Sequence, residues 1–295
     1  MNTLSGMTGF ARVTGEADWG TWAWEAKSVN GRGLDVRVNT PPGFDSLERL
    51  VKTAAGKLFK RGSLQVSLRI ELNETTDAVS INFNLFNALL EAAEAAHGAG
   101  VSSEAVATLM TVKGVVESGG ANIRDLANDE SVSAVLEQAA EQVLSELAEA
   151  RKAEGLALSG ILLQLLNELE AFAAEAATLA VDQPSLLKAR LSKQLDELDA
   201  ENRVDAERQA AELALTAAKA DVREELDRLT AHFATGKSLL SEGSPVGRKL
   251  DFLAQELNRE ANTLCSKSVS LDLTNAGLGL KGVVDQFKEQ AANVE

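Results

Sequence analysis

The spacing of the hydrophobic residues changes once along this chain of 295 residues, and this change limits the folds that the chain can adopt. In the first part, apolar and polar residues alternate, which is typical of strands that bury one face. From about residue 131 onward, apolar residues recur every three or four positions, which is typical of helices that bury one side. Because strands and helices are grouped separately, the sequence predicts an α+β fold, with a small sheet-plus-helix domain followed by long helices.

The first part contains the predicted sheet. Its strands are expected where the alternation is clearest, at residues 22–29, 34–38 and 63–72, with a candidate fourth strand at 78–84. Between the second and third strands, residues 45–62 have helical spacing, with Asp45 or Ser46 as a possible N-cap and Gly62 as the end. We therefore expect residues 1–85 to form an N-terminal α+β domain.

The rest of the chain is predicted to be helical. One helix begins near residue 84 and is stopped by glycines after His97. Longer helical patterns follow at residues 131–181, 186–202, 205–241, 246–264 and 270–294. We divide this part into a helical middle region, residues 86–220, and a C-terminal helical domain, residues 221–295.

The charge is unevenly distributed. The chain has a net charge of −15, but residues 1–73 carry ten Lys and Arg against seven Asp and Glu. Residues 74–220 carry ten basic against 25 acidic residues, so the acidic excess lies in the middle region. An acidic segment keeps a protein soluble without excluding a basic surface elsewhere. The N-terminal domain can therefore contact an anionic partner.

The composition also indicates a compartment. The single cysteine, Cys265, excludes an intrachain disulfide and a zinc site built from cysteines. The first ten residues lack the basic and apolar regions of a signal peptide, and no run approaches about 18 uninterrupted apolar residues. We expect a cytoplasmic protein that does not enter a membrane.

Residues 247–267 carry an unusual variety of polar groups for a helix. Glu256 and Glu260 are four residues apart and share one side of that helix, with Asp251 about one turn earlier. Such carboxylates suit a divalent cation that prefers oxygen ligands. The alternative is an interhelical ion-pair network in which basic residues such as Arg259 neutralise them.

A second helical stretch, residues 223–232, places Glu225, Arg228 and His232 on one side. A histidine titrates near neutral pH, so His232 can serve as a metal ligand or as a general acid or base. The alternative is an exposed ladder of ion pairs that ends in a histidine.

Arginines accompany the predicted strands. They are Arg12, Arg32, Arg37 and Arg69, with Arg61 at the end of the intervening helix. A guanidinium binds phosphate oxygens bidentately, so a sheet face with several arginines suits phosphate contacts. The alternative is a solvated face on which acidic neighbours pair with the arginines. Gly31 and Gly33, on either side of Arg32, indicate a tight turn.

Seven segments carry a resemblance to a known family. They are MTGFAR (7–12), WEAKSVNGRGLDVR (24–37), TPPGF (40–44), RGSLQVSL (61–68), EELDRLTAHF (224–233), GRKLDFLAQELNREANTLCSKS (247–268) and KEQAANVE (288–295). Together they resemble the YicC/YloC family of bacterial stress-associated endoribonucleases. The resemblance lies at both ends of the chain, and the middle helices are not distinctive.

The resemblance implies an activity and an assembly. It implies endonucleolytic cleavage of RNA, supported by a divalent metal ion such as manganese or magnesium. It also implies a homo-oligomer, expected to be a hexamer, that encloses RNA and takes part in RNA turnover alongside other degradation enzymes.

The motifs and the resemblance together assign residues to roles. The expected RNA-binding residues are Arg12, Asn30, Arg32, Arg37, Arg61, Arg69, Arg248 and Lys267. The expected metal ligands are Asp251, Glu256 and Glu260, and the expected catalytic residues are His232, Glu256, Arg259 and Glu260.

The chain also departs from the pattern of the family at several positions. Gly31 stands where a histidine is usual and Lys288 where an arginine is usual. Ala291 and Ala292 replace a more polar pair, and Cys265 occupies the place of a small residue.

The sequence thus predicts an endoribonuclease that hydrolyses phosphodiester bonds with a divalent metal ion. A metal-independent route is a second possibility, with the ribose 2′-OH attacking its own phosphate and His232 as the base. Two alternatives from other classes stay open at this point. One is a non-catalytic RNA-binding adaptor that presents RNA to another nuclease, and the other is a purely structural helical scaffold.

Overall fold

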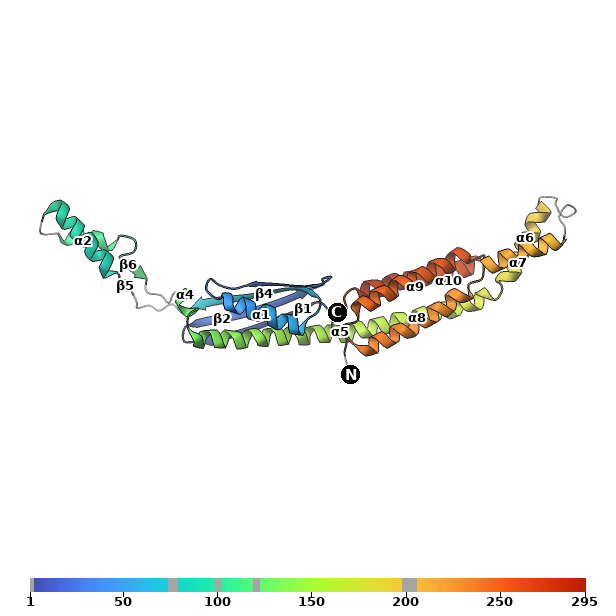
Figure 1. Cartoon of the computed structure of the whole chain (residues 1–295), viewed down its shortest axis with the longest axis horizontal. Coiled ribbons are helices and arrows are strands. Elements are labelled where there is room, and N and C mark those ends of the chain that lie inside the picture. The colour runs from blue at the N-terminus through green and yellow to red at the C-terminus, as the bar shows by residue number, and fades with distance from the viewer. Residues whose placement is uncertain (1–2, 74–78, 99–101, 119–122, 198–205) are drawn as a thin grey trace.

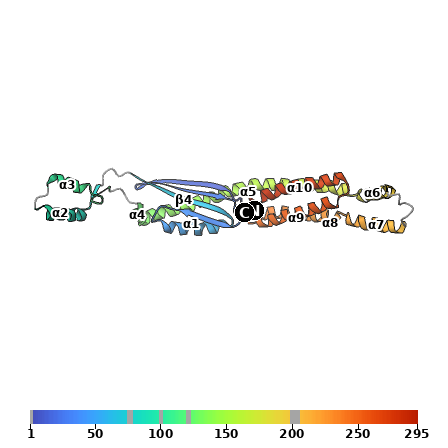
Figure 2. The same ribbon diagram turned by 90° about the horizontal axis from the view of Figure 1, so that it is seen from above.

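The molecule is elongated, with a sheet in one half and long helices in the other (Figure 1; Figure 2). The structure is a computed structural model, and it describes residues 3–73, 79–98, 102–118, 123–197 and 206–295. The first described residues and the C-terminal end lie in the middle, where the two halves meet (Figure 1). This arrangement confirms the predicted α+β fold.

Four strands form the main sheet. They are β1 (Gly9–Ala17), β2 (Gly20–Val29), β3 (Leu34–Asn39) and β4 (Gly62–Leu72). The spatial order is β1-β2-β4-β3, in which only the β3–β4 pair is parallel. A parallel pair needs a crossover connection, and α1 (Asp45–Leu58) provides it.

Sequence and structure agree on three of these strands and differ on the fourth. β2, β3 and β4 were predicted, whereas β1 was not, because three of its inward positions are the small residues Gly9, Ala11 and Gly15. The helix between β3 and β4 is also shorter than predicted. It ends at Leu58, and Gly62 instead begins β4 with a φ of +114°.

One face of the sheet is covered by α1 and by the first part of α5 (Glu130–Ala180). Trp24 lies at the centre of this core, fully buried, and its indole Nε1 donates to the Leu136 carbonyl at 3.0 Å. Along β4, buried Val66 and Leu68 alternate with outward-facing residues. The second face of the sheet is left uncovered by the described elements.

A small lobe projects from the end of the sheet that lies away from the long helices (Figure 1). It contains β5 (Val79–Ile81), α2 (Phe83–His97), α3 (Ser103–Met110) and β6 (Val116–Ser118), and α4 (Ile123–Leu126) follows it. β5 corresponds to part of the candidate strand 78–84. The strand ends early because the Asn82 side chain caps α2, accepting from the Leu85 N–H at 3.1 Å.

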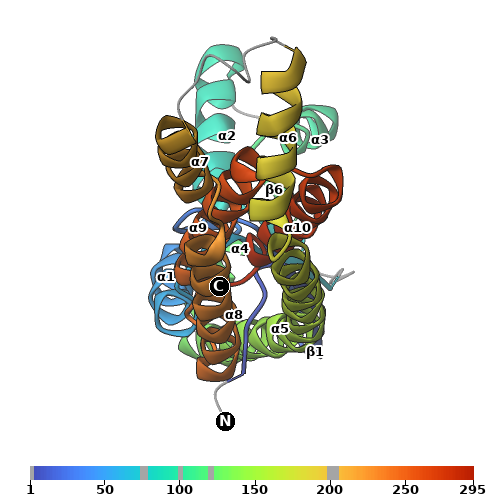
Figure 3. The ribbon, with the colours of Figure 1, turned by 90° about the vertical axis from the view of Figure 1, so that its right-hand side faces the viewer.

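The second half is a bundle of four helices. The last part of α5 packs with α8 (Arg223–Glu242), α9 (Gly247–Lys267) and α10 (Leu271–Ala291) around a separate core. An end-on view shows these helices around one axis (Figure 3). α5 therefore contributes to both hydrophobic cores. The predicted divisions at residues 85 and 220 stay predictions.

Two further helices extend the bundle at its outer end. These are α6 (Gln183–Glu197) and α7 (Ala206–Lys219), which lie side by side (Figure 2). The prediction of one helix over residues 205–241 is wrong, since α7 and α8 are separate. The break comes at Asp221, whose side chain accepts from the Arg223 N–H at 3.0 Å and so competes with the helical pattern.

A buried ion pair joins the two halves. The Arg151 guanidinium in the middle of α5 is 3.2 Å from the Glu295 carboxylate and lies over the Phe59 ring, 4.7 Å from its centroid. Burial lowers the pKa of the Arg151 guanidinium, and the Glu295 carboxylate opposes that shift. The Glu295 carboxylate also accepts from the backbone N–H groups of Lys60 and Arg61. We call this contact region the joint.

α5 is the one helix in the described ranges that is long and apolar enough to cross a membrane. The core helix of a folded protein can be as long and as apolar as a membrane-spanning helix. The buried side of α5 includes Leu136 and Leu162. Its exposed side carries charged residues such as Glu141 and Lys152. The most apolar stretch of α5 is only 33% buried, and a location outside membranes stays a prediction.

Candidate metal centre and nucleic-acid contacts

Two packed helices build the candidate centre. α8 buries Leu229 and Phe233, and α9 buries Leu257 and Leu264, so the two helices lie against each other. Glu260 belongs to the buried stripe of α9, three residues after Leu257 and four before Leu264. This packing brings polar residues at the edges of both stripes together.

His232, Glu256 and Glu260 form the candidate metal centre. One possible ligand atom from each residue lies within 4.8 Å of the other two. Glu256 is exposed, His232 is half-buried and Glu260 is only 3% exposed. The centre is therefore open to solvent at one end and fixed inside the bundle at the other. An imidazole nitrogen with two carboxylate oxygens is a donor set that suits divalent transition-metal ions.

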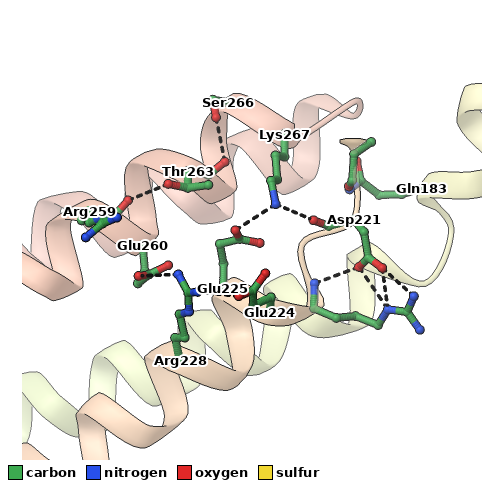
Figure 4. A network of polar contacts seen from close by, with 12 residues as sticks. Gln183, Asp221, Glu224, Glu225, Arg228, Arg259, Glu260, Thr263, Ser266 and Lys267 are labelled. Atoms are coloured by element: carbon green, nitrogen blue, oxygen red, sulfur yellow. Dashed lines mark hydrogen bonds and ion pairs between the residues drawn. The ribbon is translucent and has the colours of Figure 1, made fainter. Parts of the chain in front are cut away.

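Arg228 is hydrogen-bonded to Glu260, the buried member of this centre (Figure 4). Its Nη1 donates to the Glu260 Oε1 at 3.4 Å, and its Nη2 donates to Glu224. A hydrogen bond to one carboxylate oxygen restricts the orientation of Glu260, as partners of metal ligands commonly do. Arg228 and His232, predicted to share one side of their helix, therefore both lie beside the Glu260 carboxylate.

Two other predicted residues of α9 lie outside the three-residue cluster. The Arg259 Nη1 is 3.9 Å from the Glu256 Oε2, and the Arg259 side chain is 71% exposed. Asp251, predicted as a metal ligand, instead accepts from the Gln255 Nε2 at 3.2 Å. Within the described residues, the third member of the cluster is His232.

Lys267 takes part in a second contact between α8 and α9 (Figure 4). Its Nζ donates to the Glu225 Oε1 at 2.9 Å and to the Asp221 carbonyl at 3.0 Å. Glu225 is buried, and its Oε2 has no hydrogen-bond partner among the described residues. Hydrogen bonds from Arg223 lower the pKa of the Asp221 carboxyl to about 2. The ammonium of Lys267 is thus engaged inside the bundle, and RNA binding by it stays a prediction.

The predicted arginines of the sheet lie on its uncovered face or beside it. The Arg12 Nε is 3.5 Å from the Glu25 carboxylate, and the Arg37 Nε is 3.1 Å from the Asp35 carboxylate. Arg69 is exposed and lines a hollow of about 420 Å³ together with Arg12. Two further predicted residues, Arg32 after β2 and Arg248 in the first turn of α9, are also exposed.

Asn30 and Arg61, predicted to bind RNA, contact the C-terminal segment. The Asn30 Nδ2 donates to the Ala292 carbonyl at 2.8 Å, and the Arg61 Nη1 donates to the Val294 carbonyl at 3.4 Å. Both residues therefore contribute hydrogen bonds to the joint, and an additional RNA contact by either stays a prediction.

Arg151 and Glu295 were not singled out by the sequence. Arg151 donates through Nε to the Gly6 carbonyl at 2.7 Å and through Nη2 to the Arg61 carbonyl at 3.1 Å. One signal was available, because Arg151 lies in phase with the buried residues Leu144, Leu147 and Leu158 of its helix. A cation in an apolar stripe indicates a buried partner.

Comparison with known proteins decides the family. A family model described as "Endoribonuclease YicC-like, N-terminal region" matches residues 4–160, and one described as "Endoribonuclease YicC-like, C-terminal" matches residues 176–295. The chain belongs to the YicC-like endoribonuclease family. The resemblance predicted from its motifs is thereby confirmed.

Two relatives match this member of the family over nearly their whole length. A protein of Haemophilus influenzae, named "Probable endoribonuclease YicC", is 35% identical over 292 residues, which covers 98% of this chain and 99% of the relative. A protein of Clostridioides difficile with the same name is 27% identical over 307 residues, with 98% and 99% covered. The two matched regions are separated by residues 161–175, which lie within α5.

The departures from the family pattern can now be placed in the fold. A Cβ at Gly31 would lie 3.0 Å from the Gly62 carbonyl carbon and 3.1 Å from the Ser63 nitrogen. A side chain there requires the backbone at the start of β4 to move by a few tenths of an ångström. Cys265 faces Gly277 of α10, where an added Cβ would be 2.5 Å from its sulfur, and burial raises the pKa of the Cys265 thiol. Its role is therefore close helix packing.

Proposed function

We propose that this chain is an endoribonuclease that cleaves RNA with a divalent ion bound by His232, Glu256 and Glu260. The cluster of these three residues, with ligand atoms within 4.8 Å of one another, carries the proposal. Membership in a family of endoribonucleases supports RNA as the substrate.

The donor set favours manganese over magnesium. Magnesium prefers oxygen ligands and keeps several of its waters, whereas manganese also accepts imidazole nitrogen. The half-buried His232 contributes such a nitrogen, and the exposed Glu256 leaves the solvent side of the centre open.

The chain's own residues divide the remaining tasks. A bound divalent ion supplies charge neutralisation at the phosphate and a more acidic water. Arg228 orients Glu260 through the 3.4 Å hydrogen bond, while the exposed Arg259 is free to contact a phosphate beside Glu256. Phosphate binding would compete with the long Arg259–Glu256 contact of 3.9 Å, which is weak at an exposed site.

A cleavage assay with matched variants tests this proposal. Wild-type protein and the double variant Glu256→Gln/Glu260→Gln are incubated with an end-labelled RNA of about 25 nucleotides, with manganese, with magnesium or with chelator. Asp251→Asn is the control, because it removes a carboxylate from the same helix but outside the cluster. We expect manganese-dependent cleavage by wild type and control, and at least a 100-fold loss in the double variant.

The chemistry of the new RNA ends separates the two catalytic routes. A 5′-phosphate is expected from metal-assisted hydrolysis, and a 2′,3′-cyclic phosphate from attack by the 2′-OH with His232 as base. Cleavage that persists in chelator and in the double variant would refute the metal proposal. RNA binding without cleavage under every condition would instead favour the adaptor.

We further propose that the protein acts as a homo-oligomer, with a hexamer as the expected size. Large apolar side chains on the outside of the bundle support an interface between copies, among them Phe252 at 68% and Leu271 at 75% exposure. Light scattering after gel filtration measures the mass, and a monomer at micromolar concentration would contradict this. A cytoplasmic role in RNA turnover, alongside other RNA-degrading enzymes, completes the proposal and is compatible with a single cysteine.

A further inference from the structure

The outer face of the main sheet carries a polar pattern with one exposed aromatic ring. α1 and α5 pack on the opposite face, so these residues point away from the core. Phe10 on β1 is 58% exposed although the rest of its strand buries its apolar residues inward. An exposed aromatic ring among polar residues indicates contact with another molecule.

Phe10 belongs to a row that crosses all four strands. The register pairs Phe10 with Lys27, Lys27 with Gln65, and Gln65 with Arg37. All four side chains are exposed. Since neighbouring strands are about 4.8 Å apart, the row spans roughly 14 Å. It presents an aromatic ring, a cation, an amide and a second cation in that order.

The cations of this row are available to a ligand. Lys27 makes no ion pair with any residue that the structure describes. Arg37 contacts Asp35 at 3.1 Å, but both side chains are more than half exposed, so solvent weakens this pair. The row itself contains no carboxylate. The row itself is therefore positively charged and complements an anionic chain that follows it, while the nearest carboxylates, Glu25 and Asp35, pair with Arg12 and Arg37.

The row also lies close to the joint. Gly9, next to Phe10, packs against α5 at Leu147 and Arg151, and the loop after β2 is bonded to the C-terminal segment through Asn30. Beyond the joint, α9 starts at Gly247, and Glu256 follows nine residues later, about 14 Å along the helix. The row and the candidate metal centre thus lie on either side of the joint.

We propose that this row binds single-stranded RNA, with one base stacked on Phe10, phosphates on Lys27 and Arg37, and a base edge on Gln65. A single strand is required because a stacked base must be unpaired. The inference rests on the proposed function for its ligand. It adds a binding surface in the N-terminal domain that is separate from the cleavage centre.

Binding is measured without cleavage, so that the two proposals are tested separately. The double variant Glu256→Gln/Glu260→Gln in chelator serves as the background, and a fluorescein-labelled ten-nucleotide uridine strand is the probe. Phe10→Ala should weaken binding about 5- to 150-fold, the range expected for loss of one stacked base, while Phe10→Tyr should retain it. Thr14→Ala, on the same strand and face but outside the row, is the control.

The salt dependence tests the cations of the row. Lys27→Ala and Arg37→Ala should each lower the slope of log affinity against log salt by about 0.7, as expected for one phosphate contact on a single strand. Phe10→Ala should leave that slope unchanged. A duplex of the same length should bind without sensitivity to Phe10→Ala.

Three results would overturn the inference. An unchanged RNA affinity of the Phe10→Ala variant would refute the inference. If the Phe10→Ala variant of the otherwise wild-type chain still cleaves RNA with metal, the proposed function is unaffected by that refutation. A change in oligomer mass without a change in RNA affinity would assign the row to an interface between copies. No RNA affinity in the background protein, together with no cleavage by wild type, would refute both proposals.

Discussion

Replacing Glu295 by glutamine should destabilise the whole protein through the joint. The Glu295 side chain is 7% exposed, and its partner Arg151 is fully buried. Removing one charge of a buried ion pair typically costs about 3 to 5 kcal/mol, because the remaining charge stays out of water without compensation. The amide of glutamine has the same shape and can still accept from one backbone N–H, and the Glu154 carboxylate still partly compensates the Arg151 charge. We therefore expect a loss near the lower end, about 3 kcal/mol.

Urea titration with two probes measures this effect. Fluorescence of the three tryptophans, Trp19, Trp22 and Trp24, reports on the sheet core, because all three lie in it or pack against it. Far-ultraviolet circular dichroism reports mainly on the helices. Both midpoints should fall, since the ion pair lies between the two cores. Glu289→Gln, on the exposed side of α10, is the control and should change stability by less than about 0.5 kcal/mol.

A double-mutant cycle makes the reasoning refutable. Arg151→Met alone should also destabilise strongly, because it leaves the Glu295 carboxylate buried without its cation. The two substitutions together should cost about 1 to 3 kcal/mol less than the sum of the single effects, since neither charge is then left alone. Simple additivity, or a loss below about 1 kcal/mol for Glu295→Gln, would show that the joint does not depend on this pair.

Three further predictions concern the bundle. Arg228→Met should weaken manganese binding about 10- to 100-fold in calorimetry by freeing Glu260, with partial recovery in Arg228→Lys; equal affinity in all forms would contradict a positioning role. Lys267→Met should cost about 3 kcal/mol in urea titration, because it leaves the buried Glu225 without its cation; a loss below about 1 kcal/mol would contradict this. The lowered pKa of Asp221 stabilises the fold above pH 4, and this contribution is lost as the pH falls toward 2. Asp221→Asn should therefore flatten the stability curve between pH 4 and 2, and an unchanged curve would rule out that contribution.

The sequence was most informative where one periodicity was uninterrupted. β2, β3 and β4 alternate regularly and were predicted, whereas β1 was missed because glycine and alanine occupy its inward positions. The prediction of a single helix over residues 205–241 was wrong for a different reason. A side-chain hydrogen bond at Asp221 interrupts it, and helical spacing on both sides conceals the interruption.

The candidate centre could be predicted only in part. The spacing of Glu256 and Glu260 placed them together, because they lie on one helix. That His232 of α8 completes the group depends on how two helices pack, which spacing within one helix cannot indicate. The same limit applies to Arg151 and Glu295, which are 144 residues apart in the sequence and meet only in the folded chain.

α5 fixes the rotation of one half of the molecule against the other. Its 51 residues form one unbroken helix, and this helix contributes buried residues to both the sheet core and the bundle core. Inserting one residue near Arg151 would turn one core relative to the other by about 100° and shift it by about 1.5 Å. The joint, with its single orientation of Arg151 toward Glu295, could not form after such a turn. Changes of length in this segment are therefore tolerated only near whole turns of the helix, and the number of residues between the cores determines how the proposed RNA contacts are aligned with the candidate metal centre.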